Sequence, residues 1–187
     1  MRILIPTLVR AARRGGPKRS LLKDENGATA VEFGMVATPF LLFVLGILGM
    51  GLYYLALISL EYGVESAARK IRTGEAEKSA LTVAGFKSLI CASAIGIDCS
   101  KVTVIIDSKK TWSDVVRSSC VTNGSQTPSS GNATDALSKY SGSASQVVLV
   151  TACYHWKLAD SFKFMKFTAS DPTILQAATA FKSEPYN

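Results

Sequence analysis

Histidine is nearly absent from this chain of 187 residues, and several catalytic motifs are missing altogether. The one histidine is His155, and the sequence has no HExxH metal motif, no GxSxG nucleophile motif and no glycine-rich phosphate loop. The four cysteines include no CxxC pair, a spacing typical of zinc ligands. The sequence therefore predicts a protein that is not an enzyme and that uses no metal and no cofactor.

One pair of residues could still support catalysis. Cys153 and His155 are two positions apart, so on a strand their side chains would point to the same face. A cysteine nucleophile also needs a lowered thiol pKa and usually a third group that orients the histidine. The preferred interpretation is a disulfide cysteine next to an interface histidine.

Formal charge is absent from Phe33 to Leu60, a run of 28 residues. As a helix this run would be about 42 Å long, which exceeds the roughly 30 Å thickness of the hydrocarbon layer of a membrane. The alternative is a core helix of a soluble protein, where uncharged runs seldom exceed about 18 residues. We expect a membrane-spanning helix over residues 28–60, bent near Pro39, that continues over residues 61–73.

Small side chains recur along one face of this helix. They are Gly49, Ala56, Ser59, Gly63 and Ala67. Such a face allows another helix to approach closely. Gly and Ala are also simply frequent in membrane helices, so the pattern alone leaves both interpretations open.

Acidic residues are scarce at the N-terminus. Residues 1–27 carry seven Lys and Arg against two acidic residues, a net charge of +5, whereas the other 160 residues carry 14 against 12, a net charge of +2. A basic segment before an apolar run fixes membrane orientation more often than it binds nucleic acid. We expect a cytoplasmic N-terminus, an exported domain over residues 61–187, and no nucleic-acid partner. A secretory signal peptide would have an apolar region of only about 7–15 residues.

A single carboxylate, Glu32, stands directly before the uncharged run. A carboxylate inside hydrocarbon costs several kcal/mol unless it is paired, is protonated or lies at the interface. A position at the headgroup boundary would explain Glu32 if it were considered alone.

The neighbours of Glu32 resemble the processing site of type IV pilin-like proteins, and more narrowly that of the TadE-like minor pseudopilins of Tad (tight adherence, Flp-type) pilus systems. The matching features are the basic leader, then Asp24-Glu25-Asn26-Gly27, then ATAVEF and the apolar helix. Near the C-terminus, VVLVTACYHW (residues 147–156) and ATAFKSEPY (residues 178–186) are similar to the later strands and the terminal Glu-Pro-aromatic signature of these proteins.

The resemblance implies that a prepilin peptidase cuts between Gly27 and Ala28 and removes the leader, residues 1–27. Glu32 then becomes the fifth residue of the mature chain, and Glu32 and Phe33 are the expected assembly residues. When subunits pack with an axial offset, Glu32 can pair with the new ammonium of a neighbour, and low dielectric favours only a correctly placed pair.

The resemblance also implies a location in the bacterial inner membrane with the exported domain in the periplasm, a set of partners and a role. The partners are the prepilin peptidase, other pilins and pseudopilins, the Tad inner-membrane assembly platform and membrane lipid. The role is to support pilus biogenesis and surface adhesion. The alternative is a bitopic inner-membrane protein that keeps its leader and binds a ligand or partner through its periplasmic domain.

The exported part is expected to be an α+β domain with a type IV pilin-like layout, in which the long helix and a second helix pack on a small antiparallel sheet. The expected core positions are Leu60, Val64, Ala67, Ala68 and Ile71 on the long helix and Leu81, Ala84, Phe86 and Leu89 on a helix over residues 77–93. Strands are expected over residues 101–107, 146–156 and 175–184, the second of them central. Residues 118–145 are expected to form an exposed loop. Core positions are also expected for most of the aromatic residues Trp112, Tyr154, Trp156, Phe162, Phe164 and Phe167.

The four cysteines lie on the expected periplasmic side, where two disulfides are typical. Three pairings are possible. We favour Cys91 with Cys99, which closes a local loop, and Cys120 with Cys153, which ties the Ser-rich segment to a strand. Zinc binding is the competing interpretation, and four reduced thiols would require a cytosolic domain.

Overall fold

The computed structural model describes residues 27–162 and 173–185, and these divide into two compact units, one ending at Val44 and the other beginning at Leu45. The basic leader with its Asp24-Glu25-Asn26 segment lies outside the described residues. So do Phe164 and Phe167 of the predicted aromatic cluster and Tyr186 of the terminal signature. The second unit, residues 45–185, is called the α+β domain below.

Helix α1 covers Ala28–Arg72, which agrees within one residue with the helix predicted over residues 28–60 and 61–73. Its interior contains Pro39, which cannot donate a backbone hydrogen bond, and the hydroxyl of Thr38 donates to the carbonyl of Gly34 at 2.7 Å. The last turn contains three basic residues, which suit the negative end of the helix dipole. Directly after the helix, Gly74 adopts the left-handed conformation at φ 72° that commonly ends helices.

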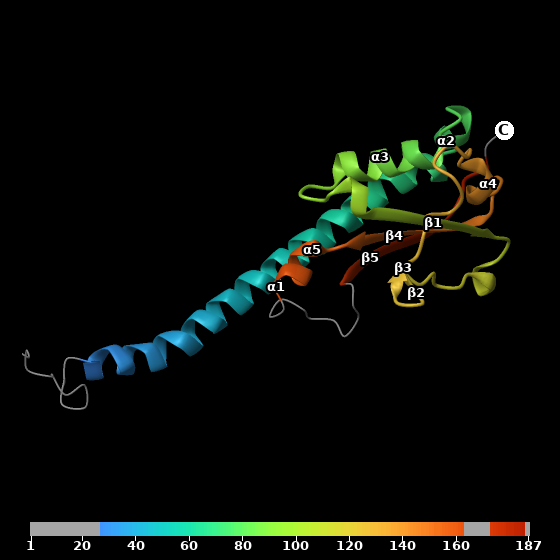
Figure 1. Cartoon of the computed structure of the whole chain (residues 1–187). Helices are drawn as coiled ribbons and strands as arrows, with labels where there is room; N and C mark the ends of the chain where they lie inside the picture. The colour runs from blue at the N-terminus through green and yellow to red at the C-terminus, as the bar shows by residue number, and fades with distance from the viewer. Residues whose placement is uncertain (1–26, 163–172, 186–187) are drawn as a thin grey trace, which may run out of the picture. The chain divides into compact units, whose positions relative to one another are not determined.

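The sheet of the α+β domain has three antiparallel strands in the order β1-β4-β5 (Figure 1). They are β1 (Val102–Lys109), β4 (Val147–His155) and β5 (Ile174–Lys182). Every residue of β4 before His155 is buried, which confirms the predicted central strand. In β1, the alternating residues Val102, Val104 and Ile106 are buried, as the sequence predicts.

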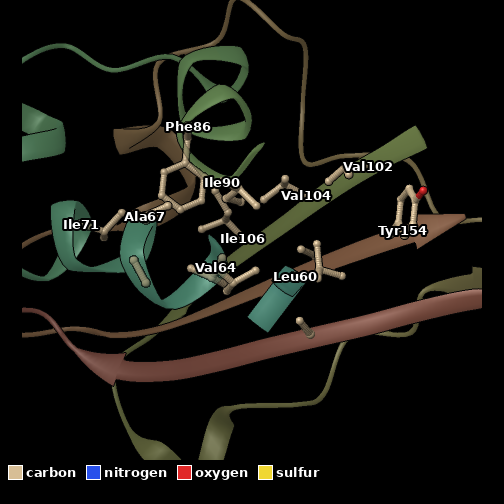
Figure 2. Packing of buried hydrophobic residues seen from close by; sticks show 14 of the residues in the cluster. Leu60, Val64, Ala67, Ile71, Phe86, Ile90, Val102, Val104, Ile106 and Tyr154 are labelled. Atoms are coloured by element: carbon tan, nitrogen blue, oxygen red, sulfur yellow. The ribbon is translucent and has the colours of Figure 1, made fainter. Parts of the chain in front are cut away.

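Two helices cover one face of this sheet. The C-terminal part of α1 and helix α3 (Val83–Ser93) place their apolar residues against β1 and β4 (Figure 2). The predicted core positions on α1 are all confirmed, since Leu60, Val64, Ala67, Ala68 and Ile71 are each at most 3% exposed. The fold class is therefore α+β with a pilin-like layout, as expected.

The predicted helix over residues 77–93 is wrong in its start and in part of its buried face. The structure has a short helix α2 (Glu75–Lys78), a break at Ala80 with φ 48°, and then α3 with Thr82 as its cap. The Thr82 side chain accepts a hydrogen bond from the amide of Gly85 at 3.1 Å, so a new helix begins there. Because α3 starts at this cap, Val83, Phe86 and Ile90 are buried, whereas Ala84 is exposed.

The region of residues 118–145, predicted as a loop, contains regular structure. It includes the hairpin strands β2 (Val121–Thr122) and β3 (Ser125–Gln126) and helix α4 (Ser138–Ser141). Three further short elements are η3 (Cys99–Lys101), η4 (Trp112–Asp114) and α5 (Lys157–Ser161). The segment also covers the outer edge of β1, because Ser129 and Ser130 accept hydrogen bonds from the amides of Val104 and Ile106.

The predicted aromatic core is correct for two residues and wrong for two others. Tyr154 and Trp156 are buried, at 7% and 5% exposed. Trp112 and Phe162 are 56% and 46% exposed. Trp112 lies in η4, three residues after β1 ends, so it no longer follows the alternation that buries the strand.

Candidate processing and assembly site

Gly27 directly precedes the first residue of α1, Ala28. Gly27 is exposed, and a Cβ atom built on it would meet no atom within 4 Å. Its backbone is also outside the left-handed region that favours glycine. Among the described residues, the fold therefore has room for a side chain here and does not require glycine.

Glu32 is the fifth residue of α1 and lies one turn after Ala28. It is exposed, and it makes no ion pair or hydrogen bond with any residue that the structure describes. The first turn of α1 contains no acidic residue, so within α1 Glu32 is the carboxylate nearest to the positive end of the helix dipole. The charge of Glu32 therefore has no partner among the residues that the structure describes.

Phe33 begins a series of exposed apolar side chains. It is 75% exposed, and Val31, Met35 and Val36 are between 60% and 74% exposed. A contiguous apolar surface of this kind on a soluble protein would be unfavourable unless lipid or another protein covered it. The structure thus places Glu32 and Phe33 together on a part of α1 that needs external contacts.

Helix α1 is long and apolar enough to cross a membrane, and among the described residues no other helix is. Only 6% of its most apolar stretch is buried, whereas a core helix of a soluble protein would be mostly buried. These properties are those of a single-pass membrane helix.

Packing of the α+β domain begins before the expected end of the span at residue 60. The ring of Tyr53 contacts the ring of Trp156 edge to face at 5.6 Å between centroids, and Ala56 and Leu57 pack against the core. The sequence does not predict this contact, because the two residues are 103 positions apart and no local pattern links them.

The stripe of small residues on α1 has a packing role within the chain. A Cβ atom built on Gly63 would lie 2.6 Å from the carbonyl oxygen of Ile90, so the backbones of α1 and α3 approach closely. The Ser59 hydroxyl donates to the carbonyl of Ile95, just after α3, at 2.8 Å. From Ser59 onward this face is therefore occupied by α3 and is not available to another subunit.

The structure joins Cys91 to Cys99 and Cys120 to Cys153, which is the pairing that the sequence favoured. Their Cα atoms are 5.8 Å and 5.6 Å apart, within the usual range for disulfides. Both bridges lie in the α+β domain, and they are separate from the residues around Gly27 and Glu32.

The arrangement around His155 does not provide a cysteine nucleophile. The sulfur of Cys153 is bonded to Cys120, and His155 instead contacts the carboxylate of Asp160 on α5 through its Nε2 atom. The described residues also contain no group of three or more His, Cys, Asp or Glu side chains that could hold a metal ion.

Part of the chain matches a known protein family. The model of the TadE-like protein family matches residues 27–69, which run from Gly27 through most of α1 and include Glu32 and Phe33. No curated protein and no solved structure matches the chain. The resemblance inferred from the residues is confirmed for this segment, and it relates the chain to the Tad pilus system.

Proposed function

We propose that this chain is a TadE-like minor pseudopilin, a structural subunit that supports the biogenesis of a Tad-type pilus and hence surface adhesion. The observation that carries the proposal is the position of Glu32, an unpaired carboxylate on the fifth residue of a helix that begins directly after an unconstrained glycine. This pattern lies in the segment that matches the TadE-like family.

Cleavage between Gly27 and Ala28 by a prepilin peptidase is the first step of the proposal. Because the fold does not require glycine at position 27, its small size is best explained by a narrow peptidase cleft that binds an extended leader. Hydrolysis of this peptide bond would leave a new ammonium on Ala28 at the start of α1. A cation at this end of a helix is unfavourable, so the new terminus favours a nearby carboxylate.

Glu32 of a neighbouring subunit is the proposed partner of this ammonium. The pair would neutralise two charges at the membrane boundary, and only one axial offset between helices would bring them together. Phe33 and the exposed apolar residues beside it would then pack between helices once subunits leave the lipid. The remaining proposed partners are other pilins and pseudopilins and the inner-membrane assembly platform, with the α+β domain on the periplasmic side.

The test is the mass and N-terminal sequence of the protein from membranes, with and without a co-expressed prepilin peptidase. The proposal predicts a chain that starts at Ala28 only when the peptidase is present. The matched variants are Gly27→Leu, which should remain uncut, and Gly51→Leu, which changes a glycine that is equally unconstrained but lies away from the cut. An uncut chain under both conditions would favour a bitopic membrane protein that binds a ligand or partner through its α+β domain.

A further inference from the structure

One end of the α+β domain gathers several elements around α1. At this end β1 begins and β4 ends, with Val102 opposite Tyr154. The packing of Tyr53 on Trp156 brings α5 to the same end, and the hydrogen bond of Ser59 brings the turn after α3 (Figure 1). We call this the near end, because α1 enters the domain here and reaches the opposite end at Arg72, whose carbonyl accepts from the amide of Glu184, beyond the end of β5.

Ile95 is an exposed apolar residue in a braced turn at the near end. It is 84% exposed, more than any other large apolar side chain in the described residues. Its carbonyl is held by Ser59, and the Cys91–Cys99 disulfide closes the turn in which it lies. A side chain held outward on a constrained backbone does not collapse onto the protein, so its apolar surface is available to a surrounding medium.

Three lysines surround a single aspartate beside this turn. Asp98 interacts electrostatically with Lys87 on α3, Lys101 in η3 and Lys157 on α5. Hydrogen bonds from Ser100 are the main cause of a lowered pKa at Asp98, and Lys101 and Lys157 lower it further. Asp160, the other carboxylate of this group, lies on α5 and contacts His155. The near end therefore combines a cluster of three lysines with an outward apolar side chain, a combination that suits an anionic lipid surface.

The position of this end along α1 agrees with the depth of lipid headgroups. Counting about 20 residues of hydrocarbon from Phe33 places the membrane boundary near Tyr53. Ser59 is six residues further, about 9 Å along the helix, and the headgroup layer is about 6 Å thick. The Ile95 carbonyl is hydrogen-bonded to Ser59, so the Ile95 side chain needs to extend only a few ångströms to enter the headgroup layer.

We propose that the near end of the α+β domain lies on the membrane that α1 spans, with Ile95 among the lipid headgroups and Lys87, Lys101 and Lys157 facing anionic phosphates. This inference rests on the membrane anchoring in the proposed function. It assigns the domain a fixed docked position in the membrane before the subunit is incorporated into a pilus.

Fluorescence quenching by brominated lipid tests the docked position. The full chain is reconstituted in vesicles of phosphatidylcholine and phosphatidylglycerol that carry bromine near the top of the acyl chains. The emission of a tryptophan at position 95 is the emission of the variant Trp112→Phe/Ile95→Trp minus that of the variant Trp112→Phe. The matched control is the native Trp112, which follows the far end of β1, about 23 Å along the strand from Val102. It is measured as the difference between the unmodified chain and Trp112→Phe.

The proposal predicts a several-fold larger loss of emission at position 95 than at position 112. Equal quenching at the two positions would overturn it, as would a blue-shifted emission at position 95 without quenching, which would show that protein rather than lipid covers the turn. Extraction of the unmodified chain by alkaline carbonate would overturn the membrane anchoring as well. Retention in the membrane with no quenching at position 95 would overturn the docked position alone.

Two triple variants test the role of the near-end lysine charges. Lys87→Gln/Lys101→Gln/Lys157→Gln should reduce quenching at position 95 in vesicles with phosphatidylglycerol. Lys109→Gln/Lys110→Gln/Lys182→Gln, at the far end of the sheet, should leave it unchanged. The same reduction in both triple variants would overturn the role of the near-end lysines.

Discussion

The two parts of α1 form one continuous helix but meet their surroundings in opposite ways. None of residues 28–44 is buried, and their side chains are mostly apolar. In residues 45–72, by contrast, seven residues are buried, five of them in the core of the α+β domain. A segment can therefore be fully helical without packing against the rest of its own chain. From Leu60 onward the aliphatic side chains of α1 are buried within the chain, whereas residues 28–44 and the exposed apolar residues from Leu45 to Ile58 need lipid or other subunits.

Gly27 and the glycines of α1 also differ in how closely they are packed. A side chain at Gly27, Gly34, Gly46 or Gly51 would meet nothing within 4 Å. One at Gly63 would collide with the backbone of α3. A side chain at Gly63 should therefore reduce stability, whereas one at Gly27 or Gly34 should affect only processing or assembly.

The largest expected effect is at Glu32, where a substitution should change pilus assembly without changing stability. Glu32→Gln should abolish co-assembly with pilins, because the neutral amide cannot pair with the Ala28 ammonium, while cleavage and thermal unfolding stay unchanged. Glu61→Gln is the matched control, since Glu61 is an exposed glutamate on the same helix within the α+β domain. The measurement is the amount of each variant in sheared pili. Normal incorporation of the Glu32 variant would contradict the proposed role.

The disulfides should stabilise only the second part. Replacing Cys120 and Cys153 by alanine opens a link across a sequence separation of 33, which the chain-entropy relation values at about 4 kcal/mol. Replacing Cys91 and Cys99, with a separation of 8, should cost about 2.5 kcal/mol. Urea unfolding followed by fluorescence measures both values. A larger loss from the shorter link would contradict this ranking.

Gly63→Ala should destabilise the α+β domain. The added Cβ lies 2.6 Å from the Ile90 carbonyl, and overpacking of this kind costs about 1–3 kcal/mol. The higher helix propensity of alanine relative to glycine offsets about 1 kcal/mol of this cost. Gly51→Ala gains the propensity without the collision and should unfold at an equal or higher temperature. The melting temperatures of the two variants in detergent test the difference, and equal values would show that α3 moves aside freely.

The smallest effect concerns acid stability of the α+β domain. The pKa of Asp135 falls from 3.8 to about 2, first because the Asn132 amide donates to it, then because Tyr140 and Lys139 do. A folded pKa below the unfolded one means that Asp135 stabilises the fold above about pH 4 and loses this contribution as the pH falls toward 2. Asp135→Asn should therefore show a flatter decline of stability over that pH range. An identical decline in both proteins would show that other groups dominate.

The sequence predicts the elements whose pattern is set by burial on one or both faces. The spacing of Leu60, Val64 and Ile71 identifies the buried face of α1, and the continuous apolar run of β4 identifies the central strand. These predictions hold because a long periodic pattern has few ways to bury its apolar side.

The errors arise where a few local or distant contacts decide the structure. The cap at Thr82 restarts a helix that the apolar pattern alone would extend. Residues 118–145 fold because of specific partners, such as the Gln126 side chain that donates to the Cys153 carbonyl at 2.8 Å. Composition does not reveal such pairs. The roles of Gly27 and Glu32 stay predictions, and they can be made from the sequence because they depend on local order in the chain. The Tyr53 contact depends on a strand end more than 100 positions away.

The central claim is that Glu32 of one chain pairs with the Ala28 ammonium of another chain. Zero-length coupling by a carbodiimide, applied to pilus preparations of mixed isotope labelling, joins the Ala28 amine to a contacting carboxylate. We predict a coupled peptide that links Ala28 of one label to Glu32 of the other and that is absent from the Glu32→Gln variant. Coupling within single chains alone, in subunits that do assemble, would contradict the claim.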